Sequence, residues 1–201
     1  MDLEKVKKFV ESKFNEDYLR CEVTQSFPPK LMILHCEEVA KLALRIGREE
    51  KASPKVLETA AWLHDVAAYE EVPSGRRSEV LSAETAKRFL VESGCALDFV
   101  ESVVDTVLAC GWDPVKKPIT IEQKVLADAD FLHHIGPTGF VTTIAYYLAQ
   151  GRKIETVIQI MQQSIEGWMV YTETGKMIFK ARKGFVQRVV QFMKEETNEI
   201  L

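Results

Sequence analysis

The chain has 201 residues, 46% of them hydrophobic and 28% charged, with a formal net charge of -4. This composition is typical of a soluble globular protein, and the length suits one domain with one core. The acidic balance argues against a protein that binds duplex nucleic acid, which would normally be basic. No run of residues approaches the ~18 apolar residues of a membrane span.

The N-terminus and the cysteines indicate a cytoplasmic location. The first residues, MDLEKVKKFVESKF, are charged throughout and lack the apolar segment of a signal peptide. The four cysteines form neither a CxxC motif nor the spacing of a disulfide framework. We therefore expect reduced thiols, with Cys36 and Cys110 packed in helices. The cysteines are Cys21, Cys36, Cys95 and Cys110.

Helical periodicity dominates the first half of the chain. Pro28 and Pro29 should separate the first two helices, because proline cannot sit inside a helix. Ser53 and Pro54 form a helix start, with serine as N-cap and proline in the first turn. The expected helices here are Leu3–Phe14, Leu31 to about Glu50, and Ser53 to about Ala67.

The second half continues the pattern. Gly94 is expected to end a helix as its C-cap, while Asp98-x-x-Glu101 and Thr120-x-x-Gln123 resemble capping boxes. Runs with strand-like alternation are nearly absent, so we predict an all-α fold of eight or nine helices. We expect one domain over 1–201, with a core at about 31–150 and the helices of 153–197 packed on it. The expected helices are Glu79–Glu92, one after Asp98, Thr120 to His133, 138–149, 153–170 and 175–197.

One apolar segment, AAWLHDVAA at residues 60–68, contains His64 and Asp65 side by side. A carboxylate in such a segment is costly unless something pairs with it. Adjacent helical residues project ~100° apart, so one cation could bind both side chains. His35, on the apolar stripe of its helix, and Asp130 are the other available donors. Two imidazoles and two carboxylates suit a divalent Mn, Fe, Co, Ni or Zn ion.

The order His35, His64-Asp65, Asp130 resembles the HD-domain superfamily of metal-dependent phosphohydrolases. The resemblance runs from about Leu31 to the end and extends beyond the four donors. It implies hydrolysis of a phosphate ester of a small metabolite, with a nucleotide as one candidate, through a metal-activated water. Asp65 would be both a ligand and the catalytic group oriented toward that water. The similar segments are WLHDVAAYE, LSAETAKRFLVESG, VLADADFLHHIG and TETGKMIFKARKGFVQRVVQFMKEE.

The resemblance also bears on the number of metal ions and on the choice of aspartate. Relatives with two or three metals carry extra histidines where this chain has Ser78 or Glu79, and Cys110. This difference favours one divalent ion and disfavours the di-iron oxygenases built on the same fold. In the DAD segment of the family the second aspartate is the usual ligand, so Asp130 is chosen over Asp128.

Several further residues have both a functional and a structural interpretation. Arg76 and Arg77 follow the HD segment and could attract a phosphate, although surface cations are usually just solvated. Trp112, in the next loop, could stack on a base. His133 is a candidate second-shell partner of Asp130, three residues away on the helix, or a packed histidine near a helix end.

Three functions stay open at this point. The first is the phosphohydrolase, with a small phosphorylated substrate as its partner. The second is an HD-fold metal- or nucleotide-binding regulatory module without turnover. The third is a nucleic-acid phosphodiesterase, which the acidic net charge disfavours. No membrane partner is expected, and the sequence gives neither the substrate nor the oligomeric state.

Overall fold

The computed structural model describes residues 1–20, 27–70, 72–74, 76–111 and 114–200, without the side chains of 197–200. Across these residues the chain forms nine α-helices and no strand, which confirms the predicted all-α fold. The helices are α1 Leu3–Tyr18, α2 Pro29–Glu49, α3 Pro54–Leu63, α4 Ser78–Glu92, α5 Leu97–Leu108, α6 Ile121–His134, α7 Pro137–Ala149, α8 Ile154–Gly167 and α9 Glu173–Ile200.

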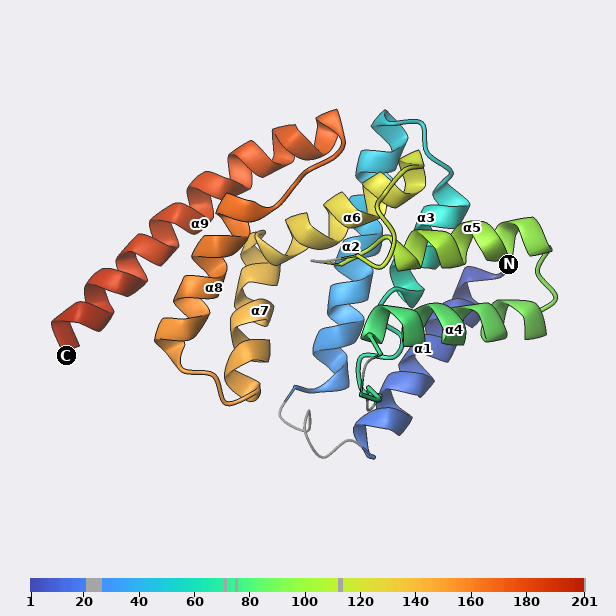
Figure 1. The fold of residues 1–201 in the computed structure, drawn as a ribbon, viewed down its shortest axis with the longest axis horizontal. Helices are drawn as coiled ribbons and strands as arrows, with labels where there is room; N and C mark the ends of the chain where they lie inside the picture. The colour runs from blue at the N-terminus through green and yellow to red at the C-terminus, as the bar shows by residue number, and fades with distance from the viewer. Residues whose placement is uncertain (21–26, 71, 75, 112–113, 201) are drawn as a thin grey trace.

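Helices α2 and α6 lie at the centre of the fold (Figure 1). Helix α2 packs most extensively against α3 and α6, while α8 and α9 pack on each other. In the view of Figure 1, α7 to α9 lie on one side of the central pair, and α1 and α3 to α5 lie on the other. Among the described residues, no helix is long and apolar enough to cross a membrane.

The apolar stripe of α2 anchors this arrangement. Val39 and Ile46 are fully buried, and His35 is buried on the same stripe, as the sequence predicts. Burying one such aliphatic side chain stabilises the fold by roughly 1.5–3 kcal/mol. The stripe therefore holds His35 against the neighbouring helices at low conformational freedom.

The segment that contains His64 and Asp65, residues 60–68, departs from the helix predicted from Ser53 to about Ala67. Helix α3 ends at Leu63, and residues 64–69 form turns, whereas the sequence suggested a helix to about Ala67. The last turn tightens, because the Val66 amide donates to the Leu63 carbonyl at 3.2 Å. His64 is thus the C-cap of α3, and Asp65 follows it outside the helix.

Other helix ends confirm or correct the predicted caps. The capping box of Thr120 and Gln123 is present in both directions at the start of α6. The box predicted at Asp98 is wrong, because the N-cap of α5 is Ala96 and Asp98 already lies in the first turn. Pro29 is the first residue of α2, where its missing N–H needs no partner.

Asp128 connects α6 to the start of α9. Its carboxylate accepts hydrogen bonds from the Tyr171 and Thr172 amides, each at 2.8 Å, and from the Thr172 hydroxyl at 2.6 Å. A Cβ at Gly175 would overlap this carboxylate, so the glycine permits the close approach. Arg182 of α9 also donates to the Leu132 carbonyl near the end of α6. These bonds give Asp128 a structural role and hold α6 against α9.

Replacing Asp128 with alanine is expected to lower the free energy of unfolding by about 3 kcal/mol, because buried donors of Tyr171 and Thr172 lose their acceptor. Chemical denaturation measures this change. The metal content of the folded variant should stay that of the wild type. Glu173→Ala, on the exposed first turn of α9, is the control and should change stability less. Loss of metal from folded Asp128→Ala would instead make this aspartate part of the metal site.

Candidate metal centre

The four predicted ligands converge from three parts of the chain. His35 comes from α2, His64 and Asp65 from the end of α3, and Asp130 from α6. The Nε2 atoms of His35 and His64 are 3.0 Å apart. Asp65 Oδ2 lies 3.5 Å from each of these nitrogens.

Asp130 closes the cluster from the opposite side. Its Oδ1 lies 3.5 Å from His35 Nε2 and 3.7 Å from His64 Nε2. Metal–ligand bonds of about 2.1 Å place neighbouring donors around one ion about 3.0 Å apart at right angles and about 3.4 Å apart in a tetrahedron. The five separations given above, from 3.0 to 3.7 Å, lie near these values. The donor set therefore suits a divalent ion in its chemistry and could hold one between these atoms.

Hydrogen bonds outside the cluster orient its members. His64 Nδ1 bonds the Ala61 carbonyl at 2.7 Å, which directs Nε2 toward the other donors. The Ala67 amide donates to Ser82 Oγ at 3.2 Å, and this bond connects the turns of residues 64–69 to α4. Metal-binding histidines usually donate their second ring N–H to an oxygen in this way.

Mutual attraction controls the charges of the metal-free cluster. Burial raises the pKa of Asp130, but the hydrogen bond from His134 and the interactions with His64 hold it well below its usual range. Burial lowers the pKa of His64, yet the charge of Asp65 and the carboxylate of Asp130 raise it to about 9. Both carboxylates are thus ionised, as metal ligands must be, and a metal would displace the proton of His64.

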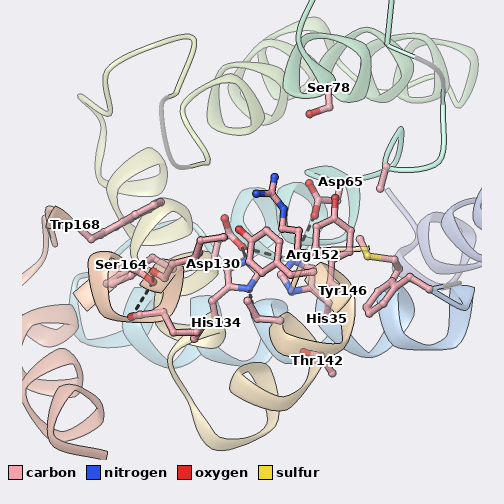
Figure 2. Close-up of a pocket in the computed structure, with 18 of the residues that line it drawn as sticks. His35, Asp65, Ser78, Asp130, His134, Thr142, Tyr146, Arg152, Ser164 and Trp168 are labelled. Atoms are coloured by element: carbon pink, nitrogen blue, oxygen red, sulfur yellow. Dashed lines mark hydrogen bonds and ion pairs between the residues drawn. The ribbon is translucent and has the colours of Figure 1, made fainter. Parts of the chain in front are cut away.

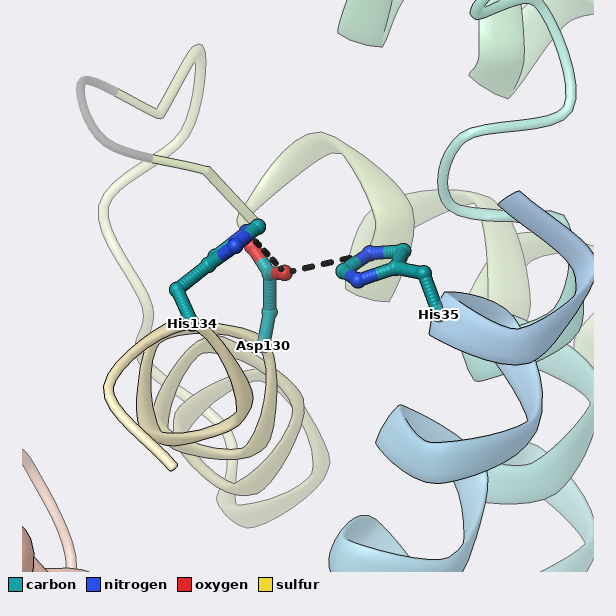
Figure 3. Close-up of side chains that lie close together, drawn as sticks. All are labelled: His35, Asp130 and His134. Carbon is teal, nitrogen blue, oxygen red and sulfur yellow. Dashed lines mark ion pairs between the residues drawn. The ribbon is translucent and has the colours of Figure 1, made fainter. Parts of the chain in front are cut away.

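The sequence named His133 as the partner of Asp130, but the neighbouring histidine is the one that reaches it. His134 Nε2 lies 3.3 Å from Asp130 Oδ1 (Figure 3). His133 is buried with its ring edge-on to His35, at 4.9 Å between centroids. On a helix, residue i+4 lies closer to the direction of residue i than residue i+3 does, which is a signal the sequence contained. The role proposed for His133 stays a prediction.

Glu79 and Cys110, which stand where relatives with two or three metals carry extra histidines, contact other residues in this structure. Cys110 Sγ donates to Asp130 Oδ2 at 3.6 Å, and burial, with the charge of Asp130, raises the pKa of its thiol well above the usual value. Cys110 is therefore a neutral donor that supports Asp130. Glu79 accepts from Arg77 at 3.3 Å and lies close to Gly111. Within the described residues, neither Glu79 nor Cys110 joins a group of metal-binding side chains.

A cavity of about 650 Å³ opens beside the cluster. His35, Asp65, Asp130 and His134 line its polar end (Figure 2). Asp65 keeps 41% of its side chain exposed, so it is the ligand most accessible from the cavity. Other lining residues come largely from α6, α7, α8 and the loops after α7 and α8; they include Phe131, Thr142, Thr143, Tyr146, Tyr147, Arg152, Met161, Ser164 and Trp168.

The cations predicted to bind substrate lie away from this lining. Arg76 pairs with Glu84 at 2.5 Å, and Arg77 interacts with Glu79. Of the described arginines and lysines, only Arg152 lines the cavity. Sequence reasoning missed this residue because it lies in the loop between α7 and α8, far along the chain from the predicted ligands. Trp112, predicted to stack on a base, and Cys21 lie outside the described residues.

Tyr146 connects the cavity wall to the metal cluster. Burial raises the pKa of its hydroxyl, and the charge of Asp65 raises it further. Its ring packs edge-on against Phe27, with 5.3 Å between centroids. The Tyr146 hydroxyl therefore stays protonated in the wall of the cavity.

Comparisons with known proteins identify relatives of this chain and of its fold. Bacillus subtilis YpgQ, an uncharacterised protein, is 31% identical over 121 residues, covering 58% of this chain and 57% of YpgQ. The match thus spans little more than half the length of that relative. The crystal structure of B. subtilis YpgQ in complex with ADP superposes with a TM-score of 0.71 at 22% identity and 97% coverage of both chains.

A second solved structure has the same fold. A predicted HD superfamily hydrolase from an uncultured Thermotogales bacterium gives a TM-score of 0.65 at 23% identity, covering 96% of this chain and 91% of that one. Residues 32–135, just over half of the chain, match the HD domain family. This range contains His35, the HD pair and Asp130. The chain therefore belongs to the HD domain family.

Proposed function

We propose that this protein is a metal-dependent phosphohydrolase that cleaves a phosphate ester of a small metabolite, with a nucleotide as the candidate substrate. The observation that carries the proposal is the convergence of His35, His64, Asp65 and Asp130 at the polar end of an open cavity. Membership of a family with HD superfamily hydrolases supports the reaction class.

The predicted ligands differ in exposure, and this difference suggests separate roles. His35, His64 and Asp130 are buried and would hold one divalent ion, while Asp65 would complete the set from the cavity side. Bound there, a divalent ion would lower the pKa of a water molecule and polarise a phosphoryl oxygen. The exposed carboxylate of Asp65 can accept a hydrogen bond from the attacking water and orient it toward phosphorus. The protonated hydroxyl of Tyr146 can donate a hydrogen bond to a phosphoryl oxygen.

The lining of the cavity suits a nucleotide. Its volume lies within the roughly 300–1,000 Å³ of small-molecule sites. Arg152 lies over the ring of Tyr147, at 5.4 Å from its guanidinium carbon to the ring centroid, and supplies a charge for phosphate. The aromatic rings of Tyr146 and Tyr147 offer faces or edges for a base. The complex of YpgQ with ADP shows that a protein of this fold can hold a nucleotide.

A substrate screen tests the proposal. Metal-free protein is loaded with Mn, Co, Ni or Zn and assayed against nucleoside mono-, di- and triphosphates and other phosphomonoesters. We expect metal-dependent release of phosphate or pyrophosphate from at least one nucleotide. A fully metallated protein without turnover would favour the regulatory module, and cleavage of RNA or DNA alone would favour the phosphodiesterase.

The arginines locate the phosphate end of the site. Arg152→Ala is expected to raise KM by roughly 10-fold or more, because a charge-assisted hydrogen bond contributes about 1.5–3 kcal/mol. Arg48→Ala is the matched control, since Arg48 is exposed, pairs with Glu49 and lies outside the cavity lining. Arg76→Ala belongs in the same series. A loss at Arg76 without one at Arg152 would contradict this placement and support the loop predicted from the sequence.

A further inference from the structure

All four histidines of the chain gather in one place. The ring centroid of His35 lies 5.1 Å from that of His64, 4.9 Å from that of His133 and 5.0 Å from that of His134. Two of these histidines are the predicted ligands. His133 is buried, and its Nε2 has no hydrogen-bond partner among the described residues, so it faces no donor or acceptor of the cluster. His134 differs, because it lines the cavity together with Asp65 and Asp130.

The two ring nitrogens of His134 have different partners. Nδ1 lies 2.8 Å from the hydroxyl of Thr143 on α7. Nε2 points at Asp130 and lies 3.3 Å from its Oδ1 (Figure 3). His64 has the same two-sided arrangement, with Nδ1 on the Ala61 carbonyl and Nε2 toward the cluster. Metal-binding histidines usually have an oxygen partner on one ring nitrogen, which orients the other nitrogen toward the metal.

The spacing favours a ligand over a simple partner of the carboxylate. A charged N–H···O bond is usually about 2.7–2.9 Å long, whereas the His134–Asp130 separation of 3.3 Å matches that of two donors on one ion. His35, Asp130 and His134 also bring one donor atom each within 4.8 Å of one another. These atoms therefore form a second group of possible ligands, which shares His35 with the group of His35, His64 and Asp65.

We propose that His134 is a fifth ligand of the single divalent ion, an inference that rests on the metal site of the proposed function. Three imidazoles and two carboxylates leave one position of an octahedron for a water molecule or a phosphoryl oxygen. Zinc in proteins is almost always bound by four ligands or by three and a water. Five protein donors therefore favour manganese, iron, cobalt or nickel over zinc in this chain.

Metal binding tests this ligand without any substrate. Wild-type protein, His134→Ala and His134→Gln are loaded with cobalt, and X-ray absorption counts the imidazoles on the ion. We expect one imidazole fewer in both variants. Their dissociation constants for Mn or Co, measured by calorimetry, should rise by more than the ~10–100-fold that loss of an outer-shell partner causes.

Thr143→Val provides the matched control. This variant removes the hydroxyl that bonds His134 Nδ1 but keeps the imidazole, so the imidazole count should stay that of the wild type. Its affinity should fall by about 10-fold. Circular dichroism of the metal-free proteins checks that all three variants fold, which is expected because 43% of the His134 side chain is exposed.

Two results would overturn the inference. One is an unchanged imidazole count and affinity in the His134 variants. The other is two ions per wild-type chain and one in His134→Ala, which would place His134 on a different ion. A wild-type protein that binds metal through three imidazoles but hydrolyses nothing would reject the proposed function and leave the role of His134 intact.

Discussion

Replacing Asp65 with alanine is expected to abolish hydrolysis and to remove the metal. Asp65 Oδ2 lies 3.5 Å from both His35 Nε2 and His64 Nε2, and among the described residues Asp130 is the other carboxylate that lines the cavity. Loss of a metal's Lewis acidity removes several kcal/mol of transition-state stabilisation. At 1.36 kcal/mol per tenfold, turnover should fall by roughly 10³-fold or more. Steady-state kinetics and elemental analysis of the purified variant measure both effects.

The helices should survive this change, because Asp65 follows the end of α3 and its carboxylate pairs with His35 and His64 of the cluster. Asp105→Ala serves as the carboxylate control: it pairs with Lys116 on the surface, and its metal content and turnover should stay near wild type. His64→Ala should behave like Asp65→Ala. Stoichiometric metal in either variant would show that the ligands are assigned wrongly.

The fold was largely predictable because its signals are local. The apolar stripe of α2, the glycine after α4 and the capping box of α6 each depend on residues within a few positions of one another. The candidate ligands were also predictable from local signals, because His35, His64, Asp65 and Asp130 each stand in an apolar segment. Their convergence follows once α2 packs against α3 and α6.

Features that depend on packing between distant segments were not predictable. The end of α3 at Leu63 requires competition between the helix and the tight turn at Val66, which periodicity does not show. Arg152 reaches the cavity only because the end of α7 folds back toward α2. The pairing of Arg76 with Glu84, eight residues away, is likewise a contact that no sequence pattern indicated.

The choice between Asp128 and Asp130 as the metal ligand depended on the family motif and not on periodicity. Both are buried aspartates two residues apart on α6, and periodicity places them on different faces. Only the family resemblance indicated which face was the metal side. The structure explains the other aspartate, because its hydrogen bonds to Tyr171 and Thr172 occupy both carboxylate oxygens.

Adding manganese or cobalt to metal-free protein, at a free concentration of about 1,000 times its Kd, is expected to raise the thermal midpoint by about 10 °C. The donors His35, His64, Asp65 and Asp130 come together only in the folded chain, so the ion binds the native state alone. Such a ligand at 1,000 times its Kd stabilises the native state by about 4 kcal/mol. For a chain of this length, each kcal/mol shifts the midpoint by roughly 2–4 °C. Differential scanning calorimetry measures the shift.

The stoichiometry of this stabilisation separates one ion from two. Two ions about 3.5–4 Å apart would each need their own ligands, and the positions of Glu79 and Cys110 supply none to the described metal-binding groups. Titration should therefore end at one equivalent per chain. Magnesium, which prefers oxygen ligands, is the control ion and should stabilise far less at the same concentration. A second step in the titration, lost on Cys110→Ala, would make Cys110 a ligand and would contradict the mononuclear site.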